Sequence, residues 1–314
     1  MTATPAQPPD RLVLGIDGGA STTTAILAEA TTGRLLGRST AGPSNIQAVG
    51  VESALRELGR AVEAAFDAAG LPYRPVAAAA LGLAGIDLDG GQVIRDWAER
   101  IELAERLSVG NDATLLFAAG TPEGWGLAVV AGTGAIAFTR RPDGREGRTG
   151  GWGYLLGDEG SAFLIGNLAL RAACRAADRI DPPTELLPAL LAKLGSADPR
   201  DFIPAVYRGT WDKAAIAALA PLVLELAAAD AAARAIFEAQ VRELARTAAG
   251  AVANADLPRE NLPVALTGGL LLHSTPFRQR FLADLQACGV SPGPVGLVDE
   301  PALGAVTLAR RMLR

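Results

Sequence analysis

Three aspartates in this chain stand beside glycine-rich turns, where a carboxylate and bare backbone can meet a polar ligand together. The first, Asp17, follows the apolar run of residues 12–16 and opens the sequence DGGASTTT. Such a turn offers backbone amides and hydroxyl groups to an anion, and the carboxylate can hold a hydrated Mg²⁺ ion. The residues by themselves fit a tight turn without a ligand equally well.

The densest glycine-rich stretch is residues 147–161, GRTGGWGYLLGDEGS, in which six of fifteen residues are glycine. Glycine lets the backbone adopt positive φ and approach a ligand closely, at an entropic cost that is unusual for a plain connection. Trp152 and the carboxylate of Asp158 suit a ligand with an apolar face and polar groups, such as a sugar. The alternative is a surface loop with a structural tryptophan.

Asp112 lies between a short strand, residues 107–109, and a helical stretch, residues 113–119. Asp is a preferred residue at the N-cap of a helix, because its side chain accepts a hydrogen bond from a free backbone amide. Position alone therefore favours a capping role for Asp112 over a chemical one.

Two further glycine turns repeat the opening pattern. Gly132, Thr133 and Gly134 join strands at 125–131 and 135–140, and the Thr133 hydroxyl can donate to a phosphate oxygen. A plain hairpin turn is the alternative there. Gly268 and Gly269 follow a strand at 263–266 and precede a helix, where bare backbone can accept the flat face of a nucleotide. The repetition suggests two related lobes.

Composition narrows the class of protein. A length of 314 residues predicts about two domains, and 49% hydrophobic with 20% charged residues is an ordinary globular balance. The net charge of −5 argues against a nucleic-acid partner, since neutralising phosphates requires clustered basic residues. The lysines are Lys193 and Lys213, neither near a glycine-rich stretch, which excludes a P-loop.

Cysteine usage and the chain's first residues predict a cytoplasmic protein without a membrane partner. Cys174 and Cys288 cannot form a disulfide framework, and His273 has no ligand cluster around it in the sequence. Residues 1–10 are polar and proline-rich, which predicts a disordered tail and not a signal peptide. Charged residues interrupt the alanine-rich apolar runs before they reach the length of a membrane span.

The elements that must position these residues alternate between strand and helix, which is typical of an α/β protein. The expected strands are residues 12–16, 25–30, 35–40, 76–83, 107–109, 125–131, 135–140, 263–266 and 295–298. The expected helices are residues 51–69, 92–101, 113–119, 162–178, 185–194, 199–207, 212–229, 231–255, 277–287 and 301–313. Ala302, Gly304 and Ala305 in the last helix permit close packing against another helix.

The order of these turns resembles a known superfamily. Residues 17–24, 129–138 and 264–271 look like the phosphate-1, phosphate-2 and adenosine motifs of actin, Hsp70 and hexokinase, and residues 301–309 resemble its second connecting helix. GGWGYLLGDEGSA together with GND resembles the N-acetylglucosamine kinase branch of the BadF/BadG/BcrA/BcrD-type ATPases. The resemblance implies a two-lobed, actin-like (ribonuclease H-like) α/β fold with an ATP cleft between lobes. We expect the lobes at residues 11–118 and 119–314, with the last helix packing back on the first.

The resemblance also implies site residues. Nucleotide contacts are expected from Gly18, Gly19, Ser21, Thr22, Gly132, Thr133, Gly134, Gly268 and Gly269. Sugar contacts are expected from Asn45, Asp112, Gly151, Trp152, Gly153 and Asp158. Asp112 would be the general base on the sugar 6-hydroxyl, which reverses the capping interpretation. Because GGAST stands where many relatives have a third glycine and a threonine, the phosphate contact could fall on Ser21 or on Thr22.

We therefore expect an ATP- and Mg²⁺-dependent kinase that phosphorylates the 6-hydroxyl of N-acetylglucosamine or glucosamine, and we expect a homodimer. The alternative within the same family is an ATPase that activates a dehydratase or reductase. Such activators hold an iron–sulfur cluster through closely placed cysteines, and the two cysteines here are far apart in sequence. A sugar-sensing regulator would need a DNA-binding segment. The zinc motif of the ROK sugar kinases is absent from the sequence.

Overall fold

The computed structural model describes residues 11–86 and 90–314, and in it the chain divides into two units. Unit 1 comprises the residues up to Gly124 together with Glu300–Arg314, and unit 2 comprises Trp125–Asp299. The expected boundary after residue 118 would fall inside a helix, Ala113–Gly120. Residues 1–10, for which the sequence predicted a disordered tail, lie outside the described residues.

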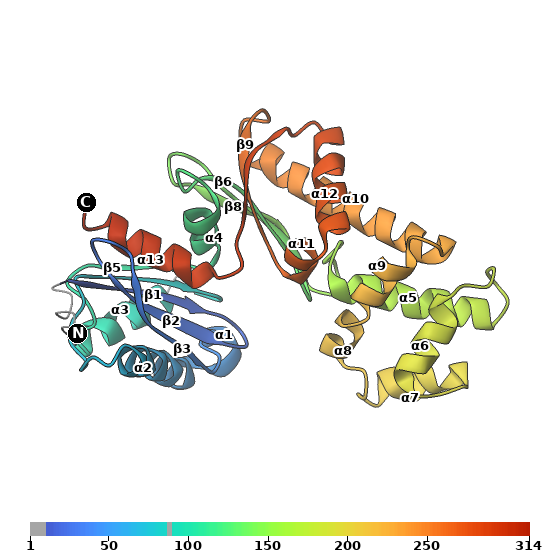
Figure 1. Cartoon of the computed structure of the whole chain (residues 1–314), viewed down its shortest axis with the longest axis horizontal. Helices are drawn as coiled ribbons and strands as arrows, with labels where there is room; N and C mark the ends of the chain where they lie inside the picture. Colours follow the sequence, from blue (N-terminus) through green and yellow to red (C-terminus); the bar gives the residue numbers. More distant parts are fainter. Residues whose placement is uncertain (1–10, 87–89) are drawn as a thin grey trace, which may run out of the picture. The chain divides into compact units, whose positions relative to one another are not determined.

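Unit 1 contains one five-stranded mixed sheet (Figure 1). The strands are β1 (Leu12–Gly18), β2 (Thr23–Glu29), β3 (Leu35–Ala41), β4 (Ala78–Leu83) and β5 (Leu107–Asn111), in the order β3-β2-β1-β4-β5. The helices are α1 (Ile46–Val49), α2 (Val51–Ala68), α3 (Gly90–Arg100), α4 (Ala113–Gly120) and α13 (Pro301–Arg311). β1, β4 and β5 are parallel, whereas β2 and β3 form antiparallel pairs with β1 and β2.

Alternating side chains give this sheet two apolar faces. Leu12, Leu14 and Ile16 pack in a core that includes residues of α2 and α3, whereas Val13 packs in a second core with residues of α13. A strand that is buried on both faces has a continuous apolar sequence, which is why the strands β1 and β4 could be predicted.

Helix α13 lies very close to the sheet because glycine stands at its contacts. A Cβ on Gly15 of β1 would lie 2.5 Å from the backbone nitrogen of Val306, and a Cβ on Gly304 would overlap the carbonyl of Leu115 in α4. The small residues predicted to allow close packing of this helix therefore do so against α4 and β1.

Unit 2 contains a second five-stranded sheet. Its strands are β6 (Gly126–Ala131), β7 (Ala135–Arg140), β8 (Glu146–Gly150), β9 (Leu262–Thr267) and β10 (Pro292–Leu297), in the order β10-β9-β6-β7-β8. The helices are α5 (Ala162–Ala177), α6 (Leu186–Leu194), α7 (Phe202–Tyr207), α8 (Lys213–Ala217), α9 (Ala220–Leu226), α10 (Ala231–Asn254), α11 (Gly269–His273) and α12 (Thr275–Ala287), with a 3₁₀ turn at Pro199–Asp201. Read from β6, this is the strand order and pairing of unit 1, as expected for related lobes.

Two sequence predictions are wrong in unit 2. Residues 147–150 belong to the edge strand β8 and not to a loop, because backbone pairing with β7 holds a polar, glycine-containing segment that shows no apolar alternation. The single helix expected at 212–229 is two helices, α8 and α9, with a turn at Ala218 and Leu219. Pro221 lies in the first turn of α9, where its missing N–H is tolerated.

Among the described residues, no single helix is both long and apolar enough to cross a membrane. The segment Lys213–Leu226 and helix α10 meet that length and composition only as a pair, and the pair is bent by 113°.

Candidate functional site

Two carboxylates of unit 1 lie at the carboxyl edge of its parallel strands. Asp17 is the penultimate residue of β1 and pairs in register with Gly82 of β4, which in turn pairs with Gly110 of β5. Asp112 follows the end of β5 directly. Because parallel strands end at one edge of a sheet, Asp17 and Asp112 flank the end of β4, where ligands of open α/β sheets bind.

Burial raises the pKa of both acids, and the charge of Asp112 adds to the rise at Asp17. Burial, and then the charge of Asp112, raises the pKa of Asp17 from its ordinary value of 3.8 to about 6. Burial also raises the pKa of Asp112. A partly buried carboxylate with a second acid nearby favours a cation or a proton, and such sites are common where chemistry occurs.

The structure does not give Asp112 the capping role that its position first suggested. Asp112 occupies the N-cap position of α4 but has helical φ and ψ angles of −58° and −31°, and its side chain makes no capping hydrogen bond. Asn111 caps the start of the helix instead, since its Oδ1 accepts a hydrogen bond from the Ala113 amide at 2.9 Å. The carboxylate of Asp112 thus makes no capping hydrogen bond, although the backbone amides of Ala113 and Asp112 partly offset the effect of burial on its pKa.

The β1–β2 turn holds the predicted phosphate-1 residues. The Gly19 amide in this turn donates to the carbonyl of Thr22 at 2.8 Å. Ser21 and Thr22 are both exposed at the tip of the turn. Either hydroxyl is therefore accessible to a phosphate. Gly18 is required for packing, because a Cβ there would overlap Oγ of the buried Ser44.

Asn45 follows Ser44 and caps helix α1. Its Oδ1 accepts from the amides of Gln47 at 3.0 Å and Ala48 at 3.2 Å. The side chain also lies against Gly85, where a Cβ would overlap Oδ1. The cap uses the amide oxygen, so the Nδ2 donor is the group that Asn45 can offer to a sugar.

A cavity of about 540 Å³ in unit 2 brings the phosphate-2 and adenosine motifs together. It is lined by the predicted residues Gly132, Thr133 and Gly269 and by Ala162, Ala214, Ala217, Ala218, Ala220, Pro221, Leu224, Leu270, His273 and Ser274. A Cβ on Gly132 would lie 3.9 Å from Gly268 Cα and 4.0 Å from the Gly269 amide nitrogen, so the two glycine turns are adjacent. The volume and the mostly apolar lining suit a nucleoside.

Gly268 is not among the residues that line this cavity, and its backbone has a role in packing; its nucleotide contact stays a prediction. Its φ is +90°, and a Cβ there would lie 2.5 Å from the carbonyl carbon and oxygen of Ala131. The glycine thus lets the start of α11 cross the backbone of β6. At Gly269, in contrast, the nearest atom to a Cβ is His273 Cδ2 at 3.9 Å.

The glycine-rich segment after β8 presents an aromatic side chain to solvent. Gly151 has φ +65°, and a Cβ there would overlap the Ile136 side chain. Trp152 is 67% exposed, with the Arg148 guanidinium carbon 5.8 Å from its ring centroid. Gly153 has open space where its Cβ would be. The turn therefore holds Trp152 out of the core.

Asp158 anchors the same segment. It is buried, has φ +63°, and accepts a hydrogen bond from the Gly153 amide at 3.2 Å through Oδ1. Its Oδ2 lies 3.0 Å from the Cβ position of Gly134, at the phosphate-2 turn. The Gly160 amide donates at 3.0 Å to Oε1 of the buried Gln240 on α10. The loop is thus fixed at the end that carries Asp158.

The predicted sugar residues are divided between the units, with Asn45 and Asp112 in unit 1 and residues 151–158 in unit 2. The sequence did not indicate the α8–α9 part of the cavity lining. An alanine that lines a cavity cannot be distinguished in a sequence from an alanine that only favours a helix. His273, around which the sequence showed no ligand cluster, also lines the cavity.

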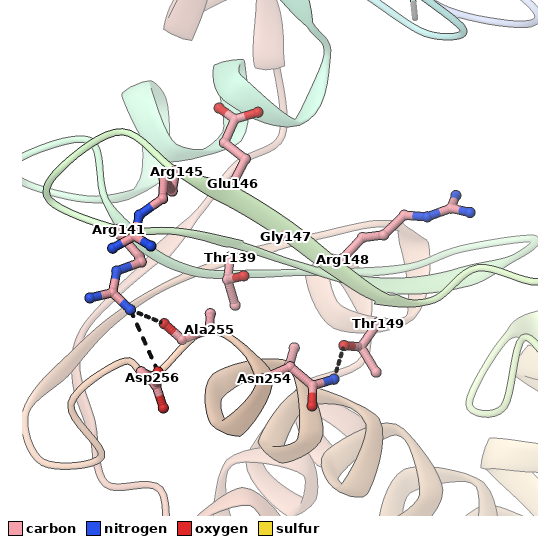
Figure 2. A pocket seen from close by; sticks show the side chains of 11 residues that line it. Thr139, Arg141, Arg145, Glu146, Gly147, Arg148, Thr149, Asn254, Ala255 and Asp256 are labelled. Carbon is pink, nitrogen blue, oxygen red and sulfur yellow. Dashed lines mark hydrogen bonds and ion pairs between the residues drawn. The ribbon is translucent and has the colours of Figure 1, made fainter.

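A second cavity of about 240 Å³ lies between β7–β8 and the end of α10 (Figure 2). It contains none of the predicted site residues. Arg141 donates to the Ala255 carbonyl at 2.8 Å and lies 4.0 Å from Asp256, and Asn254 donates to Thr149 at 3.3 Å. Several of its polar groups thus bind one another.

The two cysteines are free and belong to separate elements, Cys174 in α5 and Cys288 at the end of α12. Within the described ranges no group of three or more His, Cys, Asp or Glu side chains is placed to hold a metal ion.

Known proteins match most or nearly all of the chain. An N-acetylmuramic acid/N-acetylglucosamine kinase from Clostridium acetobutylicum is 28% identical over 302 residues, which is 96% of this chain and 98% of the relative. An N-acetyl-D-glucosamine kinase from Dictyostelium discoideum is 31% identical over 230 residues, which is 69% of this chain and 71% of the relative.

A crystal structure of a candidate N-acetylglucosamine kinase from Chromobacterium violaceum superposes with a TM-score of 0.71 at 28% identity and covers 96% of this chain and 100% of that one. The fold is that of the actin-like ATPases. Residues 14–309, which span both units, match the BadF/BadG/BcrA/BcrD ATPase family, and the chain belongs to that family.

Proposed function

We propose that this protein transfers the γ-phosphoryl group of ATP to the 6-hydroxyl of N-acetylglucosamine. The observation that carries the proposal is the acidic pair at the carboxyl edge of the unit 1 sheet, Asp17 and the uncapped Asp112. The names of the relatives support an amino sugar as the acceptor. The cavity of unit 2 supports a nucleotide as the donor.

Asp112 is the general base in this proposal. Phosphoryl transfer needs mainly positioning and charge stabilisation, and one carboxylate accepts the proton of the attacking hydroxyl. Burial raises the pKa of Asp112, which makes its carboxylate a better proton acceptor than an exposed aspartate. Since Asn111 caps α4, the carboxylate of Asp112 is left for the hydroxyl.

Asp17 fits a magnesium ion. Mg²⁺ keeps several of its waters and binds through one or two carboxylates together with phosphate oxygens. A carboxylate whose pKa is about 6 because of burial and a neighbouring negative charge gains most from a cation, since the cation offsets both effects. When bound, Mg²⁺ would offset negative charge on the transferring phosphoryl group. The chain's part is to hold it at Asp17.

The phosphates of the donor are bound by the glycine turns. Thr133 supplies a hydroxyl at the edge of the nucleotide cavity, and Gly132 and Gly269 supply open backbone. The exposed Ser21 and Thr22 supply further hydroxyls on the β1–β2 turn. Backbone amides and hydroxyls in such turns stabilise the charge that develops during transfer.

Trp152 and Asn45 bind the sugar. The exposed ring of Trp152 offers an apolar surface for a pyranose face, and Nδ2 of Asn45 offers a donor. Asp158 positions this segment through the Gly153 amide.

The proposal is tested by presenting N-acetylglucosamine, glucosamine, N-acetylmannosamine, N-acetylmuramic acid and glucose with ATP and Mg²⁺, and measuring ADP release. We expect the highest kcat/KM for N-acetylglucosamine. Phosphorus–proton coupling in the NMR spectrum of the product then locates the phosphate, which should couple to the two protons on carbon 6. 6-Deoxy-N-acetylglucosamine is the matched control and should bind without reacting. Phosphate on another carbon would overturn the assignment of the 6-hydroxyl.

A further inference from the structure

One side chain of the glycine-rich segment, Tyr154, lies against two neighbouring elements of unit 2. Its ring makes an edge-to-face contact with the buried Phe163 of α5, with ring centroids 5.0 Å apart at an interplanar angle of 69°. The ammonium nitrogen of Lys213, the first residue of α8, lies 5.0 Å from the centroid of the same ring. Because Tyr154 stands between Trp152 and Asp158 in the sequence, these contacts attach the segment that carries the predicted sugar residues.

The contact between Lys213 and the ring is a cation–π interaction. Among the residues that the structure describes, the Lys213 ammonium takes part in no ion pair, and the side chain is exposed. A cation over an aromatic face is attracted by the quadrupole of the ring, and at an exposed site this attraction changes an equilibrium about two- to fivefold. The lysine therefore holds the Tyr154 ring on one side while Phe163 holds its edge on another.

The two elements that hold Tyr154 also form part of the wall of the nucleotide cavity. In α5, Ala162 precedes Phe163, and in α8, Ala214 follows Lys213. Both alanines line the cavity. A ligand in the cavity and the ring of Tyr154 are thus in contact with the same two elements.

Helices α5 and α8 also lie against each other (Figure 1). A Cβ on Gly166 of α5 would overlap the carbonyl of Ile216 in α8, so the two backbones touch. Helix α8 has five residues and is capped by Asp212, which accepts a hydrogen bond from the Ala215 amide at 2.8 Å. Because a helix this short is not stable by itself, its position depends on α5 and on the ligand that fills the cavity.

We propose that Lys213 is a positioning residue for the sugar site. Through Tyr154 it ties residues 151–158 to the wall of the nucleotide cavity, so that a nucleotide in the cavity raises the affinity for the sugar. The inference rests on the proposed function, in which the cavity binds the nucleotide and this segment binds the sugar. A ligand that contacts both Ala162 and Ala214 stabilises the arrangement of α5 and α8 that holds the ring, and binding at two sites that favour one arrangement is coupled.

The experiment measures the dissociation constant of N-acetylglucosamine by titration calorimetry, once without nucleotide and once with saturating ADP. With ADP no phosphoryl group can be transferred, so both titrations report binding alone. The ratio of the two dissociation constants is the coupling factor. We expect the sugar to bind about fivefold or more tightly when ADP is present. Equal dissociation constants in the unaltered protein would overturn the proposal without any variant.

Lys213→Met removes the charge and keeps a side chain of similar length. We expect the coupling factor to fall about two- to fivefold. The affinity for ADP without sugar should stay the same, since Lys213 is not among the residues that line the cavity. Lys213→Arg returns a cation to the ring and should restore the factor, which a merely structural role of the lysine would not explain.

Lys193→Met is the matched control, because it removes the other lysine of the chain, which belongs to α6. It should leave the coupling factor unchanged. The role of Lys213 is refuted by a factor that Lys213→Met leaves unchanged, that Lys213→Arg also lowers, or that Lys193→Met lowers equally.

A double-mutant cycle tests whether the lysine acts through the ring. Tyr154→Leu removes the contacts with Phe163 and with Lys213, so the coupling factor should fall at least as far as in Lys213→Met. Adding Lys213→Met to Tyr154→Leu should cause no further fall, whereas Tyr154→Phe keeps the ring and should keep the factor. Additive effects of the two substitutions would show that Lys213 acts by another route and would overturn the proposal.

The outcome is separable from that of the proposed function. If the protein binds and phosphorylates N-acetylglucosamine but the coupling factor does not depend on Lys213, the proposed function stands and this inference is refuted. If the sugar binds neither with ADP nor without it, the proposed function fails, and the inference fails with it.

Discussion

Replacing Asp17 by Asn should make unit 1 more stable while abolishing activity. The pKa of Asp17 is raised from 3.8 to about 6 by burial and by Asp112, so its ionisation costs more in the folded protein than in the unfolded chain. Because proton binding is linked to folding, the raised pKa of this acid stabilises the folded protein, and this contribution is fully present below pH 3.8. It is lost as the pH rises through about 6. At pH 8 the charged carboxylate should cost about 3 kcal/mol, which Asn avoids.

Hydrogen–deuterium exchange of peptides from β1 and β4 measures this effect within unit 1 alone. In a buffer without divalent ions at pH 8, exchange through unfolding should be about a hundredfold slower in Asp17→Asn, and the difference should vanish near pH 4. Asp181→Asn is a control in unit 2, where hydrogen bonds from Arg175 lower the pKa of that exposed acid, and it should leave the exchange of the β1 and β4 peptides unchanged. Equal exchange of Asp17→Asn and the unaltered protein at pH 8 would refute the electrostatic reasoning.

Three further substitutions test the other assignments. Asp112→Asn should lower kcat roughly 10²–10⁴-fold at unchanged ADP affinity and without loss of Tm, whereas a helix cap at Asp112 would leave kcat unaltered. Trp152→Ala should raise the KM for sugar about tenfold and change Tm little, because the ring is 67% exposed; an unchanged KM would make Trp152 structural. Gly268→Ala should destabilise the protein by about 3 kcal/mol, because its Cβ would overlap Ala131. Gly269→Ala should not, because the nearest atom to its Cβ would be 3.9 Å away. Equal Tm values of the two variants would refute this packing.

The sequence predicted most elements because their apolar patterns are periodic. The runs that form β1 and β4 are buried on both faces, and the helices α2 and α10 have clear apolar stripes. β8 was missed because an edge strand of polar residues and glycine is held by its neighbour and not by its own side chains. The turn between α8 and α9 was missed because its residues are mostly good helix formers.

The site was predictable only in part for a related reason. Glycine turns beside carboxylates are visible in a sequence, so Asp17, Asp112 and Thr133 could be named. Whether Asp112 caps its helix could not be predicted, because the neighbouring Asn111 can also cap it. Only the backbone angles decide between the two residues. The glycine at 268 was visible, but the β6 backbone that it avoids is distant in sequence.

The last helix has a consequence for how the protein is made. Helix α13 covers one face of the sheet in unit 1, where its residues pack with Val13, Ile26 and Ala78, yet it is synthesised after the whole of unit 2. The apolar face that it covers is therefore exposed on the nascent chain until α13 has been synthesised, which makes this face a target for chaperones and for aggregation. Unit 2 is continuous in sequence and can complete its core earlier. The sheet of unit 1 therefore leaves the ribosome before the sheet of unit 2 but is completed after it.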